Sequence, residues 1–397
     1  IRAVYSSSNG LEKRPKLRFP GFDEPWKETT LSALFSKSTQ KNADGHITNV
    51  ICNSAKLGLI PQREYFDKDI ANSDNTNGYY IIQQNDFVYN PRKSSDAPYG
   101  PISSYKYAED GIVSPLYLCF RAKDEINPLY YEWYFRSSAW HRYIYMSGDS
   151  GARHDRVSIK DDTFFAMPIN LPSEQEQSKI ASFLQSLDDR IDAQEKLVAS
   201  LKKYKRGVVK ALISGSLTFT DADHKKWETV SLAEIFNISA GGDIDRGNSS
   251  SSYSANHPYP VFANALTNSG LYGYANYFKI EGDSITVSGR GEVGHAIARH
   301  CKYVPIVRLL SLVPKHDDDV DFFAYMINAT SIYIESTGVP QLTSPQLGAV
   351  KVLRPPVSEQ KRISSFLLKL DAKIEKEERL ILRMEKVKAS MLQQLFI

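Results

Sequence analysis

Two loops of the sequence place cationic and amide side chains directly after short β-rich stretches. The first loop, residues 90–100, begins Asn90-Pro91-Arg92-Lys93, and the second, residues 288–295, contains Arg290. Guanidinium and ammonium groups donate hydrogen bonds to phosphates, and a guanidinium or a carboxamide also matches the edge of a purine base. The two loops could therefore hold an acidic, hydrogen-bonding ligand, with one arginine at the same place in each.

Other loop residues carry the same kinds of group. They are Lys56, Gln62, Arg63, Arg246, Asn264, Asn268 and His295, with hydroxyls added by Ser94, Ser95 and Tyr253. By residue type, Arg92, Lys93 and Arg290 suit guanine or phosphate, whereas Asn90, Asn264 and Asn268 suit adenine. The alternative is that each is an ordinary solvated loop residue, and residue type alone does not separate base contact from phosphate contact.

Motifs for catalysis or cofactor binding are incomplete. The run 289–294 fits G-x-G-x-x-G, but residues 295–307 read as strands, whereas a dinucleotide site needs a helix there. Asn90-Pro91 begins like an amino-methyltransferase motif, but Arg92 and Lys93 follow in place of proline and an aromatic residue. The sequence has no P-loop and no metal-ligand spacing among its eight histidines. We therefore expect no cofactor and no metal. We expect the glycines either to let the backbone approach a nucleic-acid ligand closely or simply to form a tight turn.

The elements that position these loops include a long helix over residues 171–214. Ser173 and Glu176 form an S-x-x-E capping box at its start, and Gly215 stands where a C-cap would lie. At 1.5 Å per residue such a helix is roughly 60 Å long. Apolar residues at steps of three and four predict one stripe along it. The stripe comprises Ile180, Phe183, Leu184, Leu187, Ile191, Leu197, Val198, Leu201, Tyr204, Val208 and Leu212.

The same pattern returns at the C-terminus. A shift of 183 positions aligns residues 172–214 with 355–397 without a gap, and a shift of 201 aligns Trp26 with Trp227. Such self-similarity indicates a duplicated half, with the second globular region about 18 residues shorter. The predicted boundaries are a lead-in at 1–22, globular domains at 23–170 and 216–355, and long helices at 171–215 and 356–397.

Within the globular regions, periodicity predicts α/β (α+β) domains. In the first, we expect strands at 46–60, 79–82, 86–89 and 111–120 and a helix at 128–146. In the second, we expect strands at 259–263, 284–287 and 304–313 and a helix at 321–328.

Composition is ordinary for a globular protein. The 397 residues carry a net charge of only +3, so an acidic ligand would have to bind local basic patches. Three separated cysteines indicate neither a disulfide framework nor a zinc site, which fits a reducing cytoplasm, and no apolar run is long enough to span a membrane. Because the chain begins at Ile1 and not at Met, we expect a missing upstream piece.

These motifs resemble one known family. The lead-in PKLRFPGF, the helix LPSEQEQSKIASFLQSLDDRI and its copy PVSEQKRISSFLLKLDAKI are similar to the DNA-specificity subunit of type I restriction-modification systems. The stretches GLIPQREYF, DFVYNPR and ITVSGRGEVG add weaker support. The resemblance covers nearly the whole chain, and the paired helices are its specific part.

The resemblance implies a non-enzymatic subunit with two target recognition domains, each reading one half of a bipartite double-stranded DNA sequence. It also implies an antiparallel coiled coil that sets the half-site spacing and docks two modification (methyltransferase) subunits, through which restriction subunits join. On that view the docking helices present Phe183, Leu187, Ile191, Phe366, Leu370 and Ile374.

Two alternatives stay open. A fused nuclease or methyltransferase would need a site that the sequence lacks, and a protein-only coiled-coil scaffold would leave Arg92 and Arg290 unexplained. A basic cluster on the first helix (Lys202, Lys203, Lys205, Arg206 and Lys210) is read as a solvated face near a helix C-terminus, with phosphate contact as its alternative.

Overall fold

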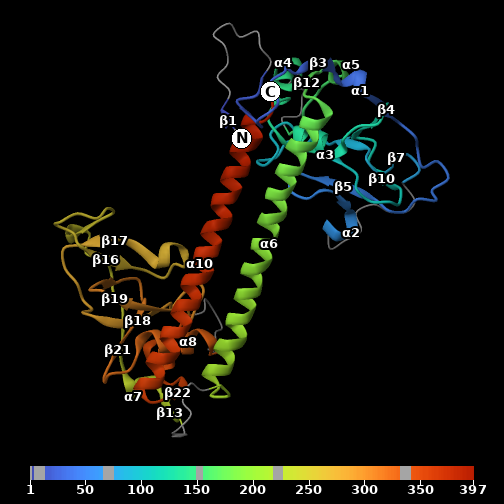
Figure 1. Cartoon of the computed structure of the whole chain (residues 1–397). Helices are drawn as coiled ribbons and strands as arrows, with labels where there is room; N and C mark the ends of the chain where they lie inside the picture. Colours follow the sequence, from blue (N-terminus) through green and yellow to red (C-terminus); the bar gives the residue numbers. More distant parts are fainter. Residues whose placement is uncertain (1, 4–13, 66–75, 149–154, 218–226, 331–340) are drawn as a thin grey trace. The chain divides into compact units, whose positions relative to one another are not determined.

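The computed structural model describes residues 2–3, 14–65, 76–148, 155–217, 227–330 and 341–397 (Figure 1). The chain divides into two compact units. Unit 1 comprises Ile1–Gln194 with Leu380–Ile397, and unit 2 comprises Glu195–Arg379. Both boundaries fall inside the long helices, so each unit contains one globular domain and about half of each helix.

The domain of unit 1 is built on a four-stranded antiparallel sheet in the order β4-β11-β8-β9. Asn127 caps helix α3 by accepting a hydrogen bond from the backbone N–H of Tyr130. The elements of the unit 1 domain are β1 (Arg2–Ala3), β2 (Leu17–Arg18), β3 (Lys27–Thr30), α1 (Leu31–Leu34), β4 (Phe35–Ser38), β5 (Ile51–Ser54), β6 (Gly58–Pro61), α2 (Gln62–Tyr65), β7 (Tyr80–Ile82), β8 (Phe87–Tyr89), β9 (Ile102–Ser104), β10 (Gly111–Val113), β11 (Leu118–Ala122), α3 (Pro128–Arg136), α4 (His141–Ser147), α5 (Asp161–Phe165) and β12 (Pro168–Leu171).

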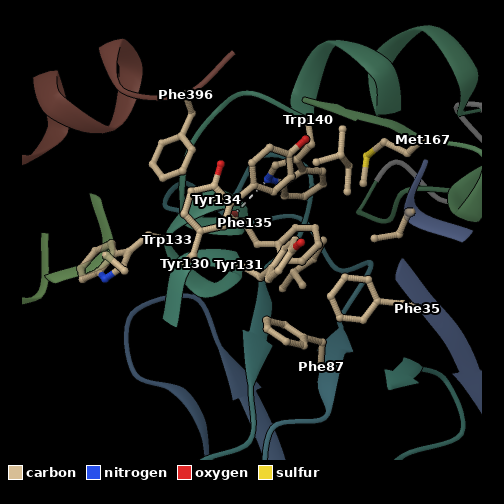
Figure 2. Close-up of a cluster of buried hydrophobic side chains, with 14 of the residues drawn as sticks. Phe35, Phe87, Tyr130, Tyr131, Trp133, Tyr134, Phe135, Trp140, Met167 and Phe396 are labelled. Atoms are coloured by element: carbon tan, nitrogen blue, oxygen red, sulfur yellow. Dashed lines mark hydrogen bonds between the residues drawn. The ribbon is translucent and has the colours of Figure 1, made fainter. Parts of the chain in front are cut away.

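An aromatic core joins this sheet to α3. Phe35 makes edge-to-face contacts with Phe120 and Tyr131, each with ring centroids 5.3 Å apart. Figure 2 shows Phe35 and Phe87 facing the aromatic side chains of α3. Edge-to-face geometry suits the ring quadrupoles, and each such pair adds about 0.5–1.5 kcal/mol beyond the burial of area.

Unit 2 repeats this plan. Its main sheet has the equivalent order β14-β21-β18-β19 and packs against α8, which Asp319 caps as Asn127 caps α3. A second sheet, β15-β17-β16-β20, has no such counterpart among the described strands of unit 1. The elements are β13 (Glu228–Ser231), α7 (Leu232–Ile235), β14 (Phe236–Ala240), η2 (Arg246–Asn248), β15 (Ser249–Ser250), β16 (Tyr259–Phe262), η3 (Thr267–Gly270), β17 (Leu271–Ala275), β18 (Asp283–Val287), β19 (Ala296–His300), β20 (Val304–Pro305), β21 (Leu310–Pro314), α8 (Val320–Ala329), α9 (Ser344–Gly348) and β22 (Lys351–Arg354).

The two long helices are α6 (Glu174–Ile213) and α10 (Val357–Gln394), green and red in Figure 1. They are antiparallel in both units, because Asp188 of α6 pairs with Lys388 near the end of α10, whereas Lys205 of α6 pairs with Asp371 near its start. The predicted fold class, with duplicated α/β domains and antiparallel long helices, is thus confirmed.

The apolar stripe of α6 is narrower than predicted. Leu184, Ile191, Val198 and Leu212 are buried at heptad spacing, as expected for a coiled-coil seam. Leu197 and Tyr204, which the sequence placed on the same stripe, are 44% and 56% exposed. Apolar residues at steps of three and four cover a wider face of the helix than the seam. Only the central residues of that face are packed against the other long helix.

Three predicted elements of unit 1 are each divided. The helix predicted at 128–146 is interrupted because the Ser137 hydroxyl and the Trp140 indole donate to the carbonyls of Tyr134 and Phe135, which ends α3 before α4 begins. The strand predicted at 111–120 is β10 and β11, separated by a turn at Pro115, whose ring has no N–H for a sheet. The strand predicted at 46–60 is likewise a hairpin, β5–β6, whose turn uses Gly58 at a φ of +71°.

Candidate nucleic-acid interface

A cleft of about 920 Å³ lies in unit 1, over the loops that follow β5 and β8. It contains five of the predicted site residues: Lys56, Gln62, Asn90, Arg92 and Lys93. Arg156, Leu116 and Tyr117 also line it, and Asp96 is the one carboxylate among its lining residues. Four cations against one carboxylate give the cleft a positive charge, which suits a polyanion.

A small amide network holds the first loop in place. The buried Asn53 side chain donates to the carbonyl of Val88 at 2.7 Å and accepts from the Ser103 hydroxyl at 2.8 Å. The Asn90 side chain in turn donates to the Asn53 carbonyl at 3.3 Å and accepts from the backbone N–H of Arg92 at 3.1 Å. Asn90 therefore organises the loop with both ends of its carboxamide.

The two ends of the same loop are held close together. The N–H of Asn90 donates to the Pro101 carbonyl at 3.0 Å, and Gly100 has a φ of +84°. A Cβ at Gly100 would lie 2.1 Å from the Asn90 carbonyl oxygen, so only glycine fits there. As a result, Arg92 and Lys93 lie on one arm of a constrained loop, just before the turn in which the Ser94 N–H donates to the Ala97 carbonyl at 3.0 Å.

Arg156 joins the cleft through backbone pairing. The N–H of Lys93 donates to the Asp155 carbonyl at 2.8 Å, and that of Val157 donates to the Pro91 carbonyl at 2.9 Å. Arg92 and Arg156 are thereby paired across a β-bridge. Sequence reasoning missed Arg156 and Asn53, because their place in the cleft comes from pairing with a distant segment.

Three further groups lie in or near this cleft. Burial raises the pKa of the Cys52 thiol, which therefore stays protonated and is a poor nucleophile. Lys56 lies 3.7 Å from Asp96, and this pair is exposed. Arg63 is exposed on α2 and does not line the cleft.

In unit 2, the glycine loop is a tight turn between strands. The Ser288 N–H donates to the His295 carbonyl at 3.0 Å, and the Gly294 N–H donates to the Ser288 carbonyl at 2.9 Å. Strand β19 follows, as the sequence predicted, so the glycines lack the helix that a dinucleotide site requires. Exposed His295 lies at the end of this turn.

The structure brings Asn264 and Arg290 to the same turn. Asn264 accepts from the Gly289 N–H at 2.8 Å and donates to the Val307 carbonyl, so its carboxamide joins two loops. Exposed Arg290 donates twice to the Gln341 side-chain oxygen, at 2.8 and 3.1 Å. That amide orients the guanidinium without neutralising it.

The other candidates of unit 2 lie on separate turns. Arg246 is exposed on η2, and Asn268 is exposed at a φ of +50° on η3. Arg299, which the sequence did not single out, is buried against the Phe262 ring at 3.7 Å and donates to the Ser269 carbonyl at 2.7 Å. Burial lowers the pKa of Arg299, and its role is to hold the η3 turn.

The described part of the chain offers little for other kinds of site. Within those residue ranges, no group of three histidine, cysteine, aspartate or glutamate side chains could hold a metal ion. Across the same ranges, no helix combines the length and apolar content needed to cross a membrane.

Comparison with known proteins gives a consistent result. Residues 28–203 and 224–386 match the family model described as the type I restriction modification DNA specificity domain. Over 205 residues, half of this chain and 54% of the relative, the chain is 28% identical to a Mycoplasma pneumoniae protein named as a type I specificity subunit. It is 26% identical, over 68% of its length and 67% of the relative, to a Methanocaldococcus jannaschii protein named as the MjaX specificity subunit. The chain thus spans about half the length of the first of these relatives.

Solved structures share the fold. A specificity subunit from M. genitalium superposes with a TM-score of 0.58 at 16% identity, covering 97% of this chain and 99% of that one. The specificity subunit from Thermoanaerobacter tengcongensis gives 0.55 at 17% identity, covering 98% of each chain. A chain from a structure titled for complex assembly of the type I restriction-modification system gives 0.61 at 14%, covering 94% and 97%.

Proposed function

Since this chain belongs to the type I restriction-modification DNA specificity family, we propose that it reads the DNA target for partner subunits that carry out the chemistry. The observation that carries the proposal is the cationic cleft of unit 1, where Arg92, Lys93 and Arg156 surround a space lined by polar loops. Phosphate contacts by such cations supply affinity, and side chains at base edges supply specificity.

Each domain reads one half of a bipartite sequence in this proposal. Arg92, Lys93, Lys56 and Gln62 serve the first half-site, with Arg63 at its margin. Arg290 and His295, beside the turn that Asn264 braces, serve the second, with Arg246 and Asn268 on neighbouring loops. Asn90 and Asn264 act through the loops they hold, because both ends of each carboxamide are already engaged.

The long helices set the spacer and dock two methyltransferase subunits in this proposal. Ile191, Leu370 and Ile374 are buried, so of the predicted docking residues these three support the helices from within. Exposed apolar side chains on the same helices offer surface to a partner: Leu197, Tyr204, Leu368, Leu382 and Val387. Restriction subunits join through the methyltransferase, and catalysis and its cofactors belong to those partners. The cytoplasm, expected from the cysteine content, is the proposed compartment.

The test is to map methylated bases across the genome of cells that express this chain with its methyltransferase subunit, by single-molecule sequencing. The proposal predicts a bipartite methylated motif with a fixed unspecified spacer. Replacing both Arg92 and Lys93 with alanine is expected to weaken the first half-site and leave the second intact. An active, bound methyltransferase with no new motif would instead favour a scaffold that binds only protein.

A second experiment tests the spacer. One extra helical turn inserted after Ile191 in α6 is expected to change the spacer and leave both half-sites unchanged. A matched insertion in the exposed turn at Gly21 leaves α6 intact and should leave the spacer as it is.

A further inference from the structure

Two lysines occupy seam positions of the long helices where apolar residues would normally pack. Lys205 stands seven residues from both Val198 and Leu212, and Lys388 stands seven residues before Leu395. Both are largely buried, with side chains 26% and 24% exposed. A lysine at such a position lowers stability relative to leucine, and the best-attested use of a polar seam residue is to specify the register of the helices.

In unit 1, Lys388 brings three helices together. Its ammonium group pairs with Asp188 of α6 and lies 5.3 Å from the centroid of the Trp133 ring on α3. Arg136, also on α3, lies 3.5 Å from the second oxygen of Asp188. Trp133 lies on the side of this buried cluster that is away from Phe35 and Phe87 (Figure 2). We call Lys388, Asp188, Trp133 and Arg136 the first node.

Unit 2 repeats this arrangement with the helices exchanged. Lys205 of α6 pairs with Asp371 of α10 and lies 5.1 Å from the Tyr325 ring centroid on α8. The Tyr325 hydroxyl donates to Asp371 at 2.6 Å, and burial with the nearby carboxylate raises the pKa of Tyr325, so it remains a donor. These three residues form the second node.

The nodes are related by the internal duplication. Asp188 and Asp371 are 183 residues apart, as are Lys205 and Lys388, and the aromatic partners lie on the equivalent helices α3 and α8. The pair Lys202–Glu378 differs, because it joins the same two long helices at 2.6 Å but lies in solvent, with side chains 51% and 41% exposed. It provides a natural control.

We propose that the two nodes fix the register of the long helices, that is, the axial alignment of α6 with α10. They would thereby hold each recognition domain in one position on the helix pair and keep the DNA spacer at one length. This inference rests on the proposed function. Seam residues repeated every seven positions tolerate a slide of one heptad, and Glu195 and Glu378 stand seven residues beyond Asp188 and Asp371. A slipped pair would therefore still offer each lysine a carboxylate.

The domain helices remove this ambiguity. Trp133 and Arg136 on α3, and Tyr325 on α8, can meet the lysine–aspartate pair in one register only. A slide of seven residues moves a helix by about 10 Å, close to three base pairs at about 3.4 Å each. The positioning residues are Lys388 with Asp188 and Lys205 with Asp371, and none of them needs to touch DNA.

The test replaces both charges of the first node by leucine, Lys388→Leu with Asp188→Leu, in the chain assembled with its methyltransferase. Apolar replacement of a buried ion pair is often neutral or stabilising, so we expect an unchanged or higher thermal midpoint. The methylated motif should nevertheless lose its single spacer, with additional sites differing by about three base pairs. Two control variants accompany it. Lys388→Arg keeps the cation and should keep a single spacer, and Lys202→Leu with Glu378→Leu should leave the methylated motif and its spacer unchanged.

A motif with the native single spacer in the Lys388→Leu, Asp188→Leu variant would overturn the proposal. So would a lowered midpoint with methylation recovered at lower temperature, since that is the behaviour of a merely stabilising contact. Should that variant not fold, Tyr325→Phe removes only the hydroxyl from the second node and must itself broaden the spacer. If the unaltered chain directs no bipartite methylation, the proposed function fails before the nodes are tested.

Discussion

The two halves anchor the start of their long helices with an equivalent glutamate and an equivalent tryptophan, but only the first half adds a cation to the glutamate. In unit 1, the buried Glu176 accepts from Arg18 at 2.7 and 2.8 Å and from the Trp26 indole at 3.2 Å. In unit 2, the equivalent Glu359 accepts from the Trp227 indole at 3.1 Å. Its other oxygen is buried without a hydrogen-bond partner among the described residues.

The comparison shows which contacts both halves share and which occur in one half alone. Carboxylate and indole recur in both halves, so an indole-to-carboxylate hydrogen bond ties the start of each long helix to its domain. Arg18 belongs to the lead-in, whose strand β2 pairs with β1 within unit 1. The second half compensates nearby, where Asp318 accepts from Arg354 at 2.9 Å and from Gln360 at 3.0 Å.

The largest expected difference in stability between the two halves comes from replacing these two carboxylates. Glu176→Gln should destabilise unit 1 by about 3–5 kcal/mol, because it leaves the buried Arg18 without its counter-charge. Glu359→Gln should change stability by about 1 kcal/mol or less, since this carboxylate has no cation partner among the described residues. Denaturant unfolding followed by unit-specific hydrogen exchange would measure both, and equal losses would contradict the asymmetry.

The ends of the long helices supply the next effect. Leu212→Ala and Leu395→Ala remove equivalent buried residues and should each cost about 2–5 kcal/mol. Phe396, whose ring centroid lies 5.6 and 6.0 Å from those of Tyr130 and Tyr134, adds to this packing in unit 1. Phe396→Ala should therefore destabilise unit 1 by about 3–5 kcal/mol and leave hydrogen exchange in unit 2 unchanged.

The loop arginines should separate the halves by function. Arg92→Ala and Arg290→Ala are each expected to weaken DNA binding by the assembled complex about tenfold, and removal of an arginine that binds a phosphate should reduce the salt slope by about one. The effect of Arg92 should fall on one half-site and that of Arg290 on the other. A competition assay with DNA altered in one half-site at a time would show both effects on one side if the modular reading is wrong.

The smallest expected effect is an opposite response to pH. Burial lowers the pKa of His141 in unit 1 below 6.5, so its contribution to stability is present above 6.5 and is lost as the pH falls towards the folded value. His300 in unit 2 is desolvated, but hydrogen bonds and charge from Asp283 and Asp321 raise its pKa above 6.5. Its contribution is therefore full below 6.5 and is lost as the pH rises through the folded value.

Difference curves would isolate these two histidines. The thermal midpoint of each unit is measured between about pH 5 and 8 for the unaltered chain and for His141→Phe or His300→Gln. The gap between variant and unaltered chain should close towards acid for His141 and towards alkali for His300. Parallel curves would mean that neither imidazole changes its titration on folding.

Much of the fold could be predicted, because an internal repeat and a regular spacing of apolar residues can be recognised from the order of residues alone. The helices α6 and α10 follow from periodicity and from the 183-residue shift, and strands such as β8 and β18 follow from their β-rich composition. The division between α3 and α4 could not be predicted, because it depends on a hydroxyl and an indole that cap backbone carbonyls in the folded domain.

For the candidate site, the sequence indicated which types of side chain are present but not which contacts each side chain makes. Arg92, Lys93 and Lys56, which the sequence offered as separate candidates, line one cleft. Asn90 and Asn264 have the same chemistry as a base-reading amide, yet both hold backbone groups. Lys205, read as part of a solvated cluster, is in the seam, because its partner Asp371 lies on the other long helix.

The division of the chain into units also has a consequence for its synthesis. Unit 2 is one continuous stretch, Glu195–Arg379, whereas unit 1 joins residues from both ends of the sequence. A ribosome adding about 5–20 residues per second needs roughly 10–40 s to pass from one part of unit 1 to the other. During that time the aromatic surface that receives Phe396 stays uncovered, so the core of unit 1 is completed only when the last residues of the chain have been made.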